Sequence, residues 1–201
     1  MSHLLLAVLG IIALLISLSV HEYCHGLVAF FLGDETAQRQ GRLTLNPIAH
    51  IDPIGTVLVP LLGAISGLPL IGWAKPVPYN PYNLRFGKWG PVFVGMAGPI
   101  SNFLSAFIYA MILRGVLVWT SLTASNLLVI FLLLLIVINV FLGLFNCIPV
   151  PPLDGSKILT ALLDNPKYQP LLHTLESRGP MLLFVFLILD SFVPTPIIGT
   201  A

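Results

Sequence analysis

Residues 4–32 have the sequence LLLAVLGIIALLISLSVHEYCHGLVAFFL, and this stretch decides the fold of the chain. A helix that crosses the hydrocarbon core of a bilayer needs about 20 mostly apolar residues, at a rise of about 1.5 Å per residue. Residues 4–32 are long enough for such a helix, and no Lys or Arg interrupts them. They predict a membrane-spanning helix that carries two His and one Glu in its second half.

Four further apolar runs follow, and three of them are long and regular enough to cross a membrane. The exception is residues 54–73, where four glycines and two prolines leave no uninterrupted helical stretch of the required length. We expect this run to be broken or re-entrant. The predicted fold class is an all-α membrane protein, a polytopic bundle of about four transmembrane helices. The five runs extend from Leu4 to Leu32, Ile54 to Trp73, Pro91 to Trp119, Asn126 to Ile148 and Pro180 to about Ile198.

Two connecting segments between these runs have compositions of their own. Residues 39–53 alternate briefly at residues 42–45 and contain the turn pairs Asn46-Pro47 and Asp52-Pro53. Short alternation bounded by turn residues is typical of a β-hairpin, so we expect a small β-hairpin or an edge strand here. Residues 74–91 carry several prolines and three basic residues, and they predict an extended segment near a membrane surface.

The composition agrees with a membrane protein and excludes other classes. The chain is 57% hydrophobic and 8% charged, whereas about 25% of the residues of a soluble domain are charged. A net charge of +1 without a basic cluster gives no electrostatic footprint for nucleic acid. No linker divides the chain, so residues 1–201 are predicted to form a single domain. We expect the first apolar run to be retained, because no basic residue precedes it as in a signal peptide.

The sequence His21-Glu22-Tyr23-Cys24-His25 is an HExxH motif within the first predicted helix. Residues four apart lie on one face of a helix, so both imidazoles can reach one zinc ion. Glu22 lies about 100° around the helix, where it can act as the general base for a zinc-bound water. Ionisable residues inside a membrane span are costly and indicate function. The alternative is a set of polar residues that only satisfy one another between helices.

A catalytic zinc site needs a third protein ligand, because such sites usually combine three protein ligands with one open position. Asp154 follows the fourth apolar run, after several prolines that we expect to extend the backbone and direct its carboxylate into the bundle. We therefore choose Asp154. Asp52 is assigned to an Asx-turn and Asp190 to a helix end. Asp154 could also cap the helix predicted from Gly155 to Leu163, and the two roles are compatible.

Three motifs in this order resemble the site-2 protease family of intramembrane zinc metalloproteases, in its compact branch without PDZ or CBS domains. HEYCH at residues 21–25 matches the HExxH of that family, and AGPISN at residues 97–102 resembles its second-helix motif. NCIPVPPLDG at residues 146–155 fits the pattern NxxPxxxLDG at every fixed position. The resemblance covers about residues 15–165.

The resemblance implies an activity and a role for each motif residue. It implies hydrolysis of peptide bonds within or near transmembrane segments of membrane proteins, with one zinc ion per chain bound by His21, His25 and Asp154. It further implies that Glu22 activates water and that Asn146 orients the substrate or stabilises the oxyanion. The alternative for Asn146, and for Asn102 of the second motif, is interhelical hydrogen bonding, a common use of Asn in membranes.

Sharing one ion constrains the topology. The C-terminal ends of the first and fourth runs must lie at a similar depth on the same side, which requires the third run to cross and the second not to. Eight of the nine Lys and Arg residues then face one side, and only Arg114 lies near the other. Basic residues are enriched on the cytoplasmic side. We therefore expect a multi-pass protein of the cell membrane, with the active site open to the cytoplasm and both termini outside.

The substrate, the rival functions and the roles of two further residues can also be predicted from the sequence. The expected substrate is a transmembrane protein or peptide that unwinds and pairs with the edge of the predicted hairpin. The rivals are a membrane metal transporter or metal-binding scaffold and an inactive protease-like scaffold, but metal transport needs no general base beside a ligand. We assign Cys24 to packing rather than to metal ligation, and we prefer a turn-stabilising role for His50. The sequence does not indicate an oligomeric state.

Overall fold

The computed structural model describes residues 3–59, 62 and 73–191, and the described residues are helical or irregular, without a strand. Four of the described elements are long helices of 20 residues or more, and the others are short helices in the connections. The elements in chain order are α1 (His3–Phe31), α2 (Thr36–Arg39), η1 (Pro47–His50), η2 (Pro53–Leu58), η3 (Pro81–Asn83), η4 (Gly87–Trp89), α4 (Gly90–Trp119), α5 (Leu127–Asn146), α6 (Ser156–Leu162), η5 (Pro166–Tyr168) and α7 (Gln169–Ser191).

Three helices in the described part of the chain are long and apolar enough to cross a membrane, namely Leu4–Phe31, Gly87–Trp119 and Leu127–Asn146. They correspond to the first, third and fourth predicted runs, and their large hydrophobic side chains are widely exposed, as expected of surfaces that face lipid. Of the second run, most residues lie outside the described part. The fifth run overlaps the second half of α7, and its last residues also lie outside it. The described residues thus contain three candidate spans, and the predicted total of about four is not confirmed.

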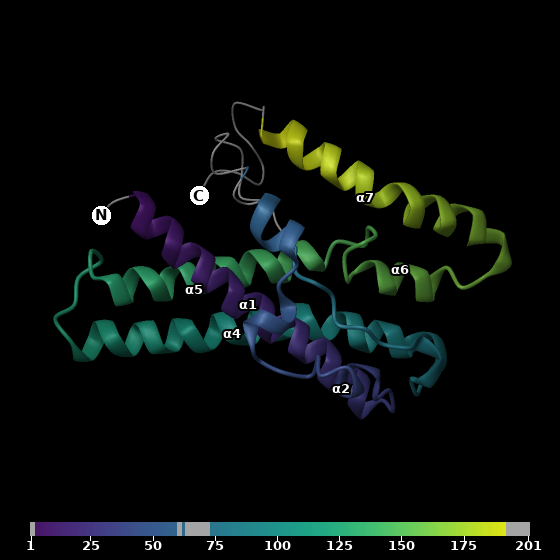
Figure 1. Ribbon diagram of the computed structural model, residues 1–201, viewed down its shortest axis with the longest axis horizontal. Helices are drawn as coiled ribbons and strands as arrows, with labels where there is room; N and C mark the ends of the chain where they lie inside the picture. The colour runs from purple at the N-terminus through teal and green to yellow at the C-terminus, as the bar shows by residue number, and fades with distance from the viewer. Residues whose placement is uncertain (1–2, 60–61, 63–72, 192–201) are drawn as a thin grey trace.

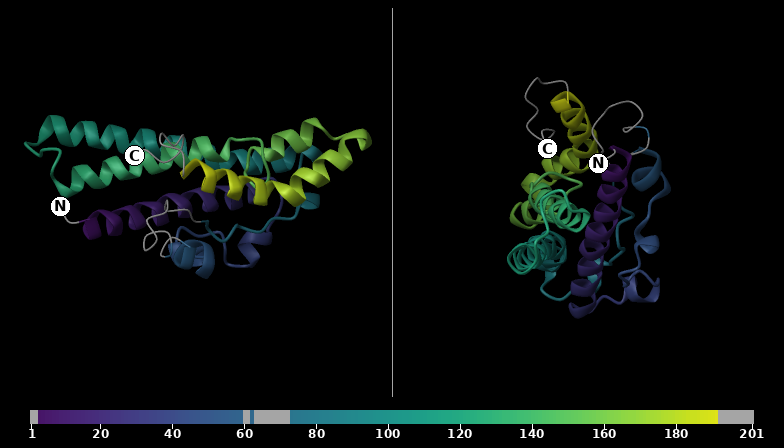
Figure 2. Two further views of the ribbon diagram at one scale, coloured as in Figure 1. Left: turned by 90° about the horizontal axis from the view of Figure 1, so that it is seen from above. Right: turned by 90° about the vertical axis from the view of Figure 1, so that its left-hand side faces the viewer.

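α4 and α5 run antiparallel side by side, and α1 crosses them (Figure 1). Seen from above, α1 lies between this pair and the segments that follow α1 (Figure 2). Small residues allow the close approach, as is usual between membrane helices. A Cβ added at Gly143 of α5 would lie 2.9 Å from the ring of Phe103 of α4. The second half of α1 is thus enclosed on both sides, where its polar residues are shielded from lipid.

The predicted β-hairpin in residues 39–53 is wrong, because these residues form turns and the 3-10 helix η1. Gly41 adopts a left-handed φ of 65°, which turns the chain directly before the alternating residues 42–45. The side chain of Asn46 caps η1 by accepting a hydrogen bond from Ile48 N–H at 3.1 Å. The His50 ring bonds the Thr44 carbonyl at 2.8 Å. Side chains thus form hydrogen bonds with backbone groups that a neighbouring strand would otherwise bond, and residues 39–53 offer no free sheet edge.

Asp34 anchors the segment between η2 and α4 to the end of α1. Its fully buried carboxylate accepts hydrogen bonds from Thr36 Oγ1 at 2.7 Å, Asn80 N–H at 2.9 Å and Asn83 Nδ2 at 2.8 Å. Burial acts to raise the pKa of Asp34, but these hydrogen bonds outweigh burial and hold the pKa below its ordinary value. Residues 73–80, which have neither helix nor strand, are thereby fixed beside the second half of α1.

Candidate active site

His21 and His25 lie one turn apart on α1 and are both buried, at 4% and 8% exposure. Their Nε2 atoms are 3.0 Å apart. The carboxylate of Asp154 reaches the same point, with Oδ2 at 3.1 Å from His21 Nε2 and 3.3 Å from His25 Nε2. The structure thus brings together the three residues that the sequence predicts as metal ligands, from positions 133 residues apart.

A compact loop after α5 delivers Asp154 to this point. The Gly155 N–H donates to the Asn146 carbonyl at 2.7 Å, so the loop returns to the end of the helix that it leaves. A Cβ at Gly155 would lie 2.3 Å from the Cys147 carbonyl oxygen, so only glycine fits. The prolines therefore lie in a series of turns, where we had expected extended backbone. Asp154 does not cap α6, because Gly155 holds the cap position without a side-chain bond.

The other ring nitrogens of the two histidines are engaged by acceptors. His21 Nδ1 lies 2.5 Å from Asn102 Oδ1, and His25 Nδ1 lies 2.7 Å from the Val94 carbonyl oxygen. An oxygen acceptor at Nδ1 requires a hydrogen there, so neutral imidazoles present bare lone pairs at Nε2. Two such lone pairs and a carboxylate then converge without a donor among them. This donor set fits a cation.

The separations fit zinc in particular. With zinc bonds of about 2.0–2.1 Å, two ligands at the corners of a tetrahedron lie about 3.3 Å apart. The three observed separations are 3.0, 3.1 and 3.3 Å. A Cβ at Gly98 of α4 would lie 2.5 Å from Nε2 of both His21 and His25, so the absence of a side chain there keeps space beside the ligand atoms.

The charge state of Asp154 also suits metal binding. Burial acts to raise the pKa of its carboxyl, but in the metal-free protein the His21 and His25 rings can protonate at Nε2, and their hydrogen bonds and positive charge then hold the pKa well below its ordinary range. The carboxylate is therefore ionised at neutral pH, which is the form that binds a metal.

Glu22 points to the side of α1 that faces residues 73–80. Its Oε2 accepts a buried hydrogen bond of 2.8 Å from the backbone N–H of Val77. Val77 is itself held nearby, since a Cβ added at Gly26 of α1 would meet its side chain at 3.1 Å. Lys75 N–H donates to the His50 carbonyl at 3.0 Å, and Arg42 donates to the Lys75 carbonyl at 2.8 Å. The carboxylate of Glu22 is thus oriented by a segment that is fixed along its length.

The remaining predicted residues take several positions. Asn146 donates to the Leu142 carbonyl of its own helix at 3.0 Å and makes no bond to the three ligands. Asp52 caps η2 by accepting from two backbone N–H groups, as the Asx-turn assignment predicts. His50 stabilises its turn through Thr44, as preferred above. Cys24 is not among the described residues that group as possible metal ligands.

Two contributors to the site were missed by the sequence reasoning. One is the Val77 N–H, a backbone group that has no side-chain signature. The other is Asn139 of α5, which is fully buried and bonds Asn102, the partner of His21. An isolated Asn inside the apolar sequence LLVIFLLLLIVINVFLGLF, residues 127–145, was a signal that could have found it.

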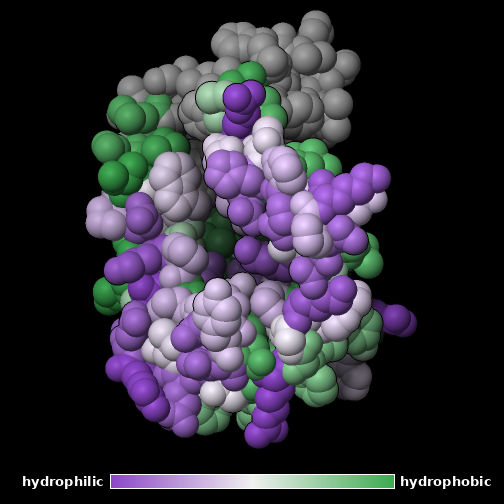
Figure 3. Space-filling model, turned by 90° about the vertical axis from the view of Figure 1, so that its right-hand side faces the viewer, coloured by the Kyte–Doolittle hydropathy of each residue, from purple (hydrophilic) through white to green (hydrophobic). Residues whose placement is uncertain are grey.

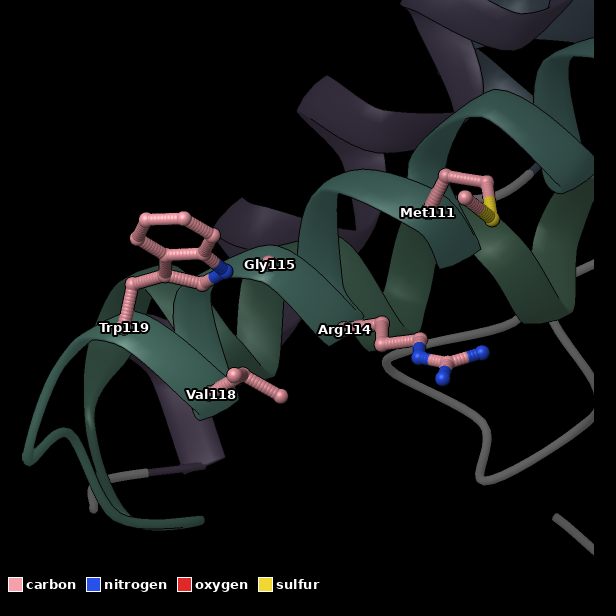
Figure 4. Close-up of a pocket in the computed structure, with 5 residues that line it drawn as sticks. All are labelled: Met111, Arg114, Gly115, Val118 and Trp119. Atoms are coloured by element: carbon pink, nitrogen blue, oxygen red, sulfur yellow. The ribbon is translucent and has the colours of Figure 1, made fainter.

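A surface pocket elsewhere does not compete with this site. It begins about 20 Å of helical rise along α4 from Gly98, and its residues come from the outer end of that helix (Figure 4). The opposite end of the molecule, viewed in Figure 3, has a mostly hydrophilic surface that is hollowed near its centre. The pocket in Figure 4 is lined by Met111, Arg114, Gly115, Val118 and Trp119.

Comparison with known proteins identifies the family. The family model described as Peptidase family M50 matches residues 115–189. A Bacillus subtilis protein named "Putative zinc metalloprotease YwhC" is 38% identical over 194 residues, which cover 94% of this chain and 85% of the relative. The chain belongs to peptidase family M50. A second relative, "Putative zinc metalloprotease Rip2" of Mycolicibacterium smegmatis, is 28% identical over 187 residues, covering 90% of the chain and 67% of the relative.

No solved structure matches this M50 chain. Its family is the site-2 protease family that its motifs resemble, so that prediction is confirmed. The chain is a zinc metalloprotease of this family with helices apolar enough to span a membrane. His21, His25 and Asp154 form a group that can hold the zinc ion.

Proposed function

We propose that this M50 protease hydrolyses peptide bonds within or near the transmembrane segments of other membrane proteins. The observation that carries the proposal is the depth of the ligand group. His21 lies ten residues before the end of α1 at Phe31, which corresponds to about 15 Å of helix. Because α1 has 29 residues, about 43 Å, it exceeds the hydrocarbon thickness of roughly 30 Å, and with an equal overhang at both ends His21 lies about 8 Å inside the hydrocarbon boundary. A peptide bond must therefore enter the membrane region to reach the site.

The proposed ligands are His21, His25 and Asp154, holding one zinc ion per chain. Zinc bound there supplies a Lewis acid that polarises a carbonyl and lowers the pKa of a water molecule. Glu22 accepts the proton of the attacking water and returns it to the leaving amine. Its Oε2 is held by the Val77 N–H, which leaves Oε1 for this proton transfer.

Asn146 is proposed to orient the substrate or to stabilise the oxyanion. One hydrogen of its side-chain amide is used by the Leu142 carbonyl. The second hydrogen is free for a substrate carbonyl, since an amide NH2 offers two donors. Asn146 also lies next to the ligand loop, because its carbonyl accepts from Gly155 N–H. No specific observation favours the rival transporter or scaffold function.

The proposed substrate is a transmembrane protein or peptide within the lipid bilayer. A peptide bond inside a helix has its carbonyl engaged by the helical hydrogen bonds, so local unwinding must precede attack. The correction of the predicted hairpin removes strand pairing at residues 42–45 as the means of holding the unwound chain.

A paired assay tests the proposal. Purified protein is incubated with a fluorogenic transmembrane peptide, as wild type and as Glu22→Gln, with the zinc content of both measured. Glu22→Gln retains the three ligands and is expected to cleave about 100-fold or more slowly, the usual contribution of a general base. Equal cleavage by both proteins at equal zinc content would refute the role of Glu22. Cleavage of soluble peptides but not of transmembrane ones would refute the substrate class.

We further propose that the chain is a multi-pass protein of the cell membrane, with its site open to the cytoplasm and both termini outside. Eight of the nine basic residues support this orientation, because they lie outside α1, α4 and α5, in the segments that follow α1 and α5. Arg114 lies near the other end of α4 (Figure 4). A reporter fused after Ala201 is expected to be non-cytoplasmic, and one placed in residues 163–167 cytoplasmic. The reverse pattern would overturn the orientation.

A further inference from the structure

A chain of side-chain hydrogen bonds crosses the bundle behind His21. It runs from Ser17 on α1 to Asn139 on α5, then to Asn102 on α4, and it ends at His21 Nδ1. Ser17, Asn102 and Asn139 are each at most 1% exposed. Such groups are costly in a membrane interior unless all their hydrogen-bonding atoms are paired. These hydrogen bonds fix the orientations of the two Asn side-chain amides.

The direction of every bond follows from one backbone carbonyl. Asn139 approaches the Leu135 carbonyl oxygen at 2.8 Å, and because a carbonyl only accepts, the amide nitrogen of Asn139 must lie there. The same nitrogen donates to Ser17 Oγ at 2.8 Å, and Ser17 in turn donates to the Ala13 carbonyl. The oxygen of the Asn139 amide is therefore turned toward α4.

The orientation of Asn102 follows in the same way. Its nitrogen must face the Asn139 oxygen, at 2.8 Å, so its own oxygen faces His21. His21 Nδ1 must then carry a hydrogen, which leaves the Nε2 lone pair directed at Asp154 and His25. One fixed carbonyl in α5 thus determines which nitrogen of His21 is protonated.

We propose that Asn139 is a positioning residue for the metal centre, and that it acts through Asn102 to hold His21 in the Nδ1–H form with Nε2 free for the metal. This inference rests on the proposed ligand set. It goes beyond that set because Asn139 belongs to none of the sequence motifs. Without Asn139, the Asn102 amide can turn over and present its nitrogen to His21, which favours the opposite tautomer.

His25 provides an internal control. Its Nδ1 faces the backbone carbonyl of Val94, which cannot turn over. Loss of Asn139 should therefore change the tautomer of His21 and leave that of His25 unchanged. The 15N chemical shifts of the two rings, measured on metal-free protein at a pH where both are neutral, report this directly. Unchanged His21 shifts in Asn139→Leu would overturn the proposal.

Zinc affinity, measured by competition with a chelator, gives a second test. Asn139→Leu has a similar shape and removes every bond of the amide. Loss of a group that orients a metal ligand typically weakens metal binding by about 10–100-fold, and we expect a loss in this range. A positioning role predicts that this loss disappears in Asn102→Asp, because a carboxylate can only accept from His21 Nδ1. In that background, Asn139→Leu should change zinc affinity by less than about threefold. Equal losses in both backgrounds would mean that Asn139 only packs the helices.

Two further variants separate a failure of the Asn139 role from misfolding and from a failure of the proposed ligand set. If Asn139→Leu does not fold, Asn139→Ser replaces it, because a serine there can donate to the Leu135 carbonyl as Ser17 and Ser19 do to theirs four residues earlier. Asp154→Ala tests the ligand set itself. If Asp154→Ala binds zinc as wild type does, the proposed metal site fails. If Asp154→Ala loses zinc but the Asn139 variants bind normally, only the role of Asn139 fails.

Discussion

Replacing Gly98 by Ala is the perturbation whose effect the structure defines most sharply. The added methyl carbon would lie 2.5 Å from His21 Nε2 and Cε1 and from His25 Nε2, whereas ordinary contact begins at 3.4 Å. The rings or α4 must therefore move by about 0.9 Å. A metal site tolerates deviations of about 0.2 Å in its bond lengths. We expect the zinc affinity of Gly98→Ala to fall by at least about 100-fold, the upper end of losses seen when a ligand loses its orientation.

Gly115→Ala is the matched control, since it lies on the same helix and nothing lies within 4 Å of its added Cβ. Both variants gain the higher helix propensity of Ala, worth about 1 kcal/mol, so the comparison isolates the clash. The assay is zinc content and affinity of purified protein, together with thermal unfolding in the absence of zinc. Overpacking should cost Gly98→Ala about 1–3 kcal/mol of stability. Zinc binding by Gly98→Ala within threefold of Gly115→Ala would refute the geometry on which the site is built.

Three further predictions concern the surroundings of the site. Val77→Pro removes the N–H that donates to Glu22. A hydrogen bond to a charged group is worth about 1.5–3 kcal/mol, so the kcat for peptide cleavage should fall by at least about tenfold. The control Val77→Ala retains the N–H and should lose much less activity. The pKa of Asp34 is lowered in the folded protein, so its ionised form stabilises the fold at pH values above the unfolded pKa of about 3.9, and this contribution is lost as the pH falls through the folded pKa. Asp34→Asn should abolish that part of the pH dependence of the free energy of unfolding. The same pH dependence in wild type and Asp34→Asn would contradict this prediction. The ion pair between Lys88 and Asp164 is 3.8 Å long and exposed, so Lys88→Ala should change the free energy of unfolding by less than about 1 kcal/mol. A larger loss would show that the pair holds η4, directly before α4, to the loop after α6.

The sequence was sufficient for the parts of the fold that follow from hydrophobic length. α1, α4 and α5 begin and end within a few residues of the predicted runs, because an uninterrupted apolar run in a bilayer has few alternatives to a helix. The convergence of His21 and His25, two of the proposed metal ligands, was also predictable, since their spacing places them on one helical face.

The errors arose where side chains bond the backbone locally. The alternation around Thr44 predicted a strand, but His50 and Asn46 satisfy the backbone there and a turn results. The contact of Glu22 with the Val77 N–H depends on a main-chain group, which any residue but proline could supply. Such contacts become visible only when distant segments are placed in space.

The distance in sequence between the proposed metal ligands has a consequence for the synthesis and membrane insertion of the protein. During synthesis on a ribosome, the chain carries its HExxH helix into the bilayer long before Asp154 has been made, 133 residues after His21. The half-built chain lacks the carboxylate and the helices that orient both imidazoles. With the proposed ligands and substrate class, the protease therefore stays inactive toward the surrounding insertion machinery until Asp154, which follows α5, has been made.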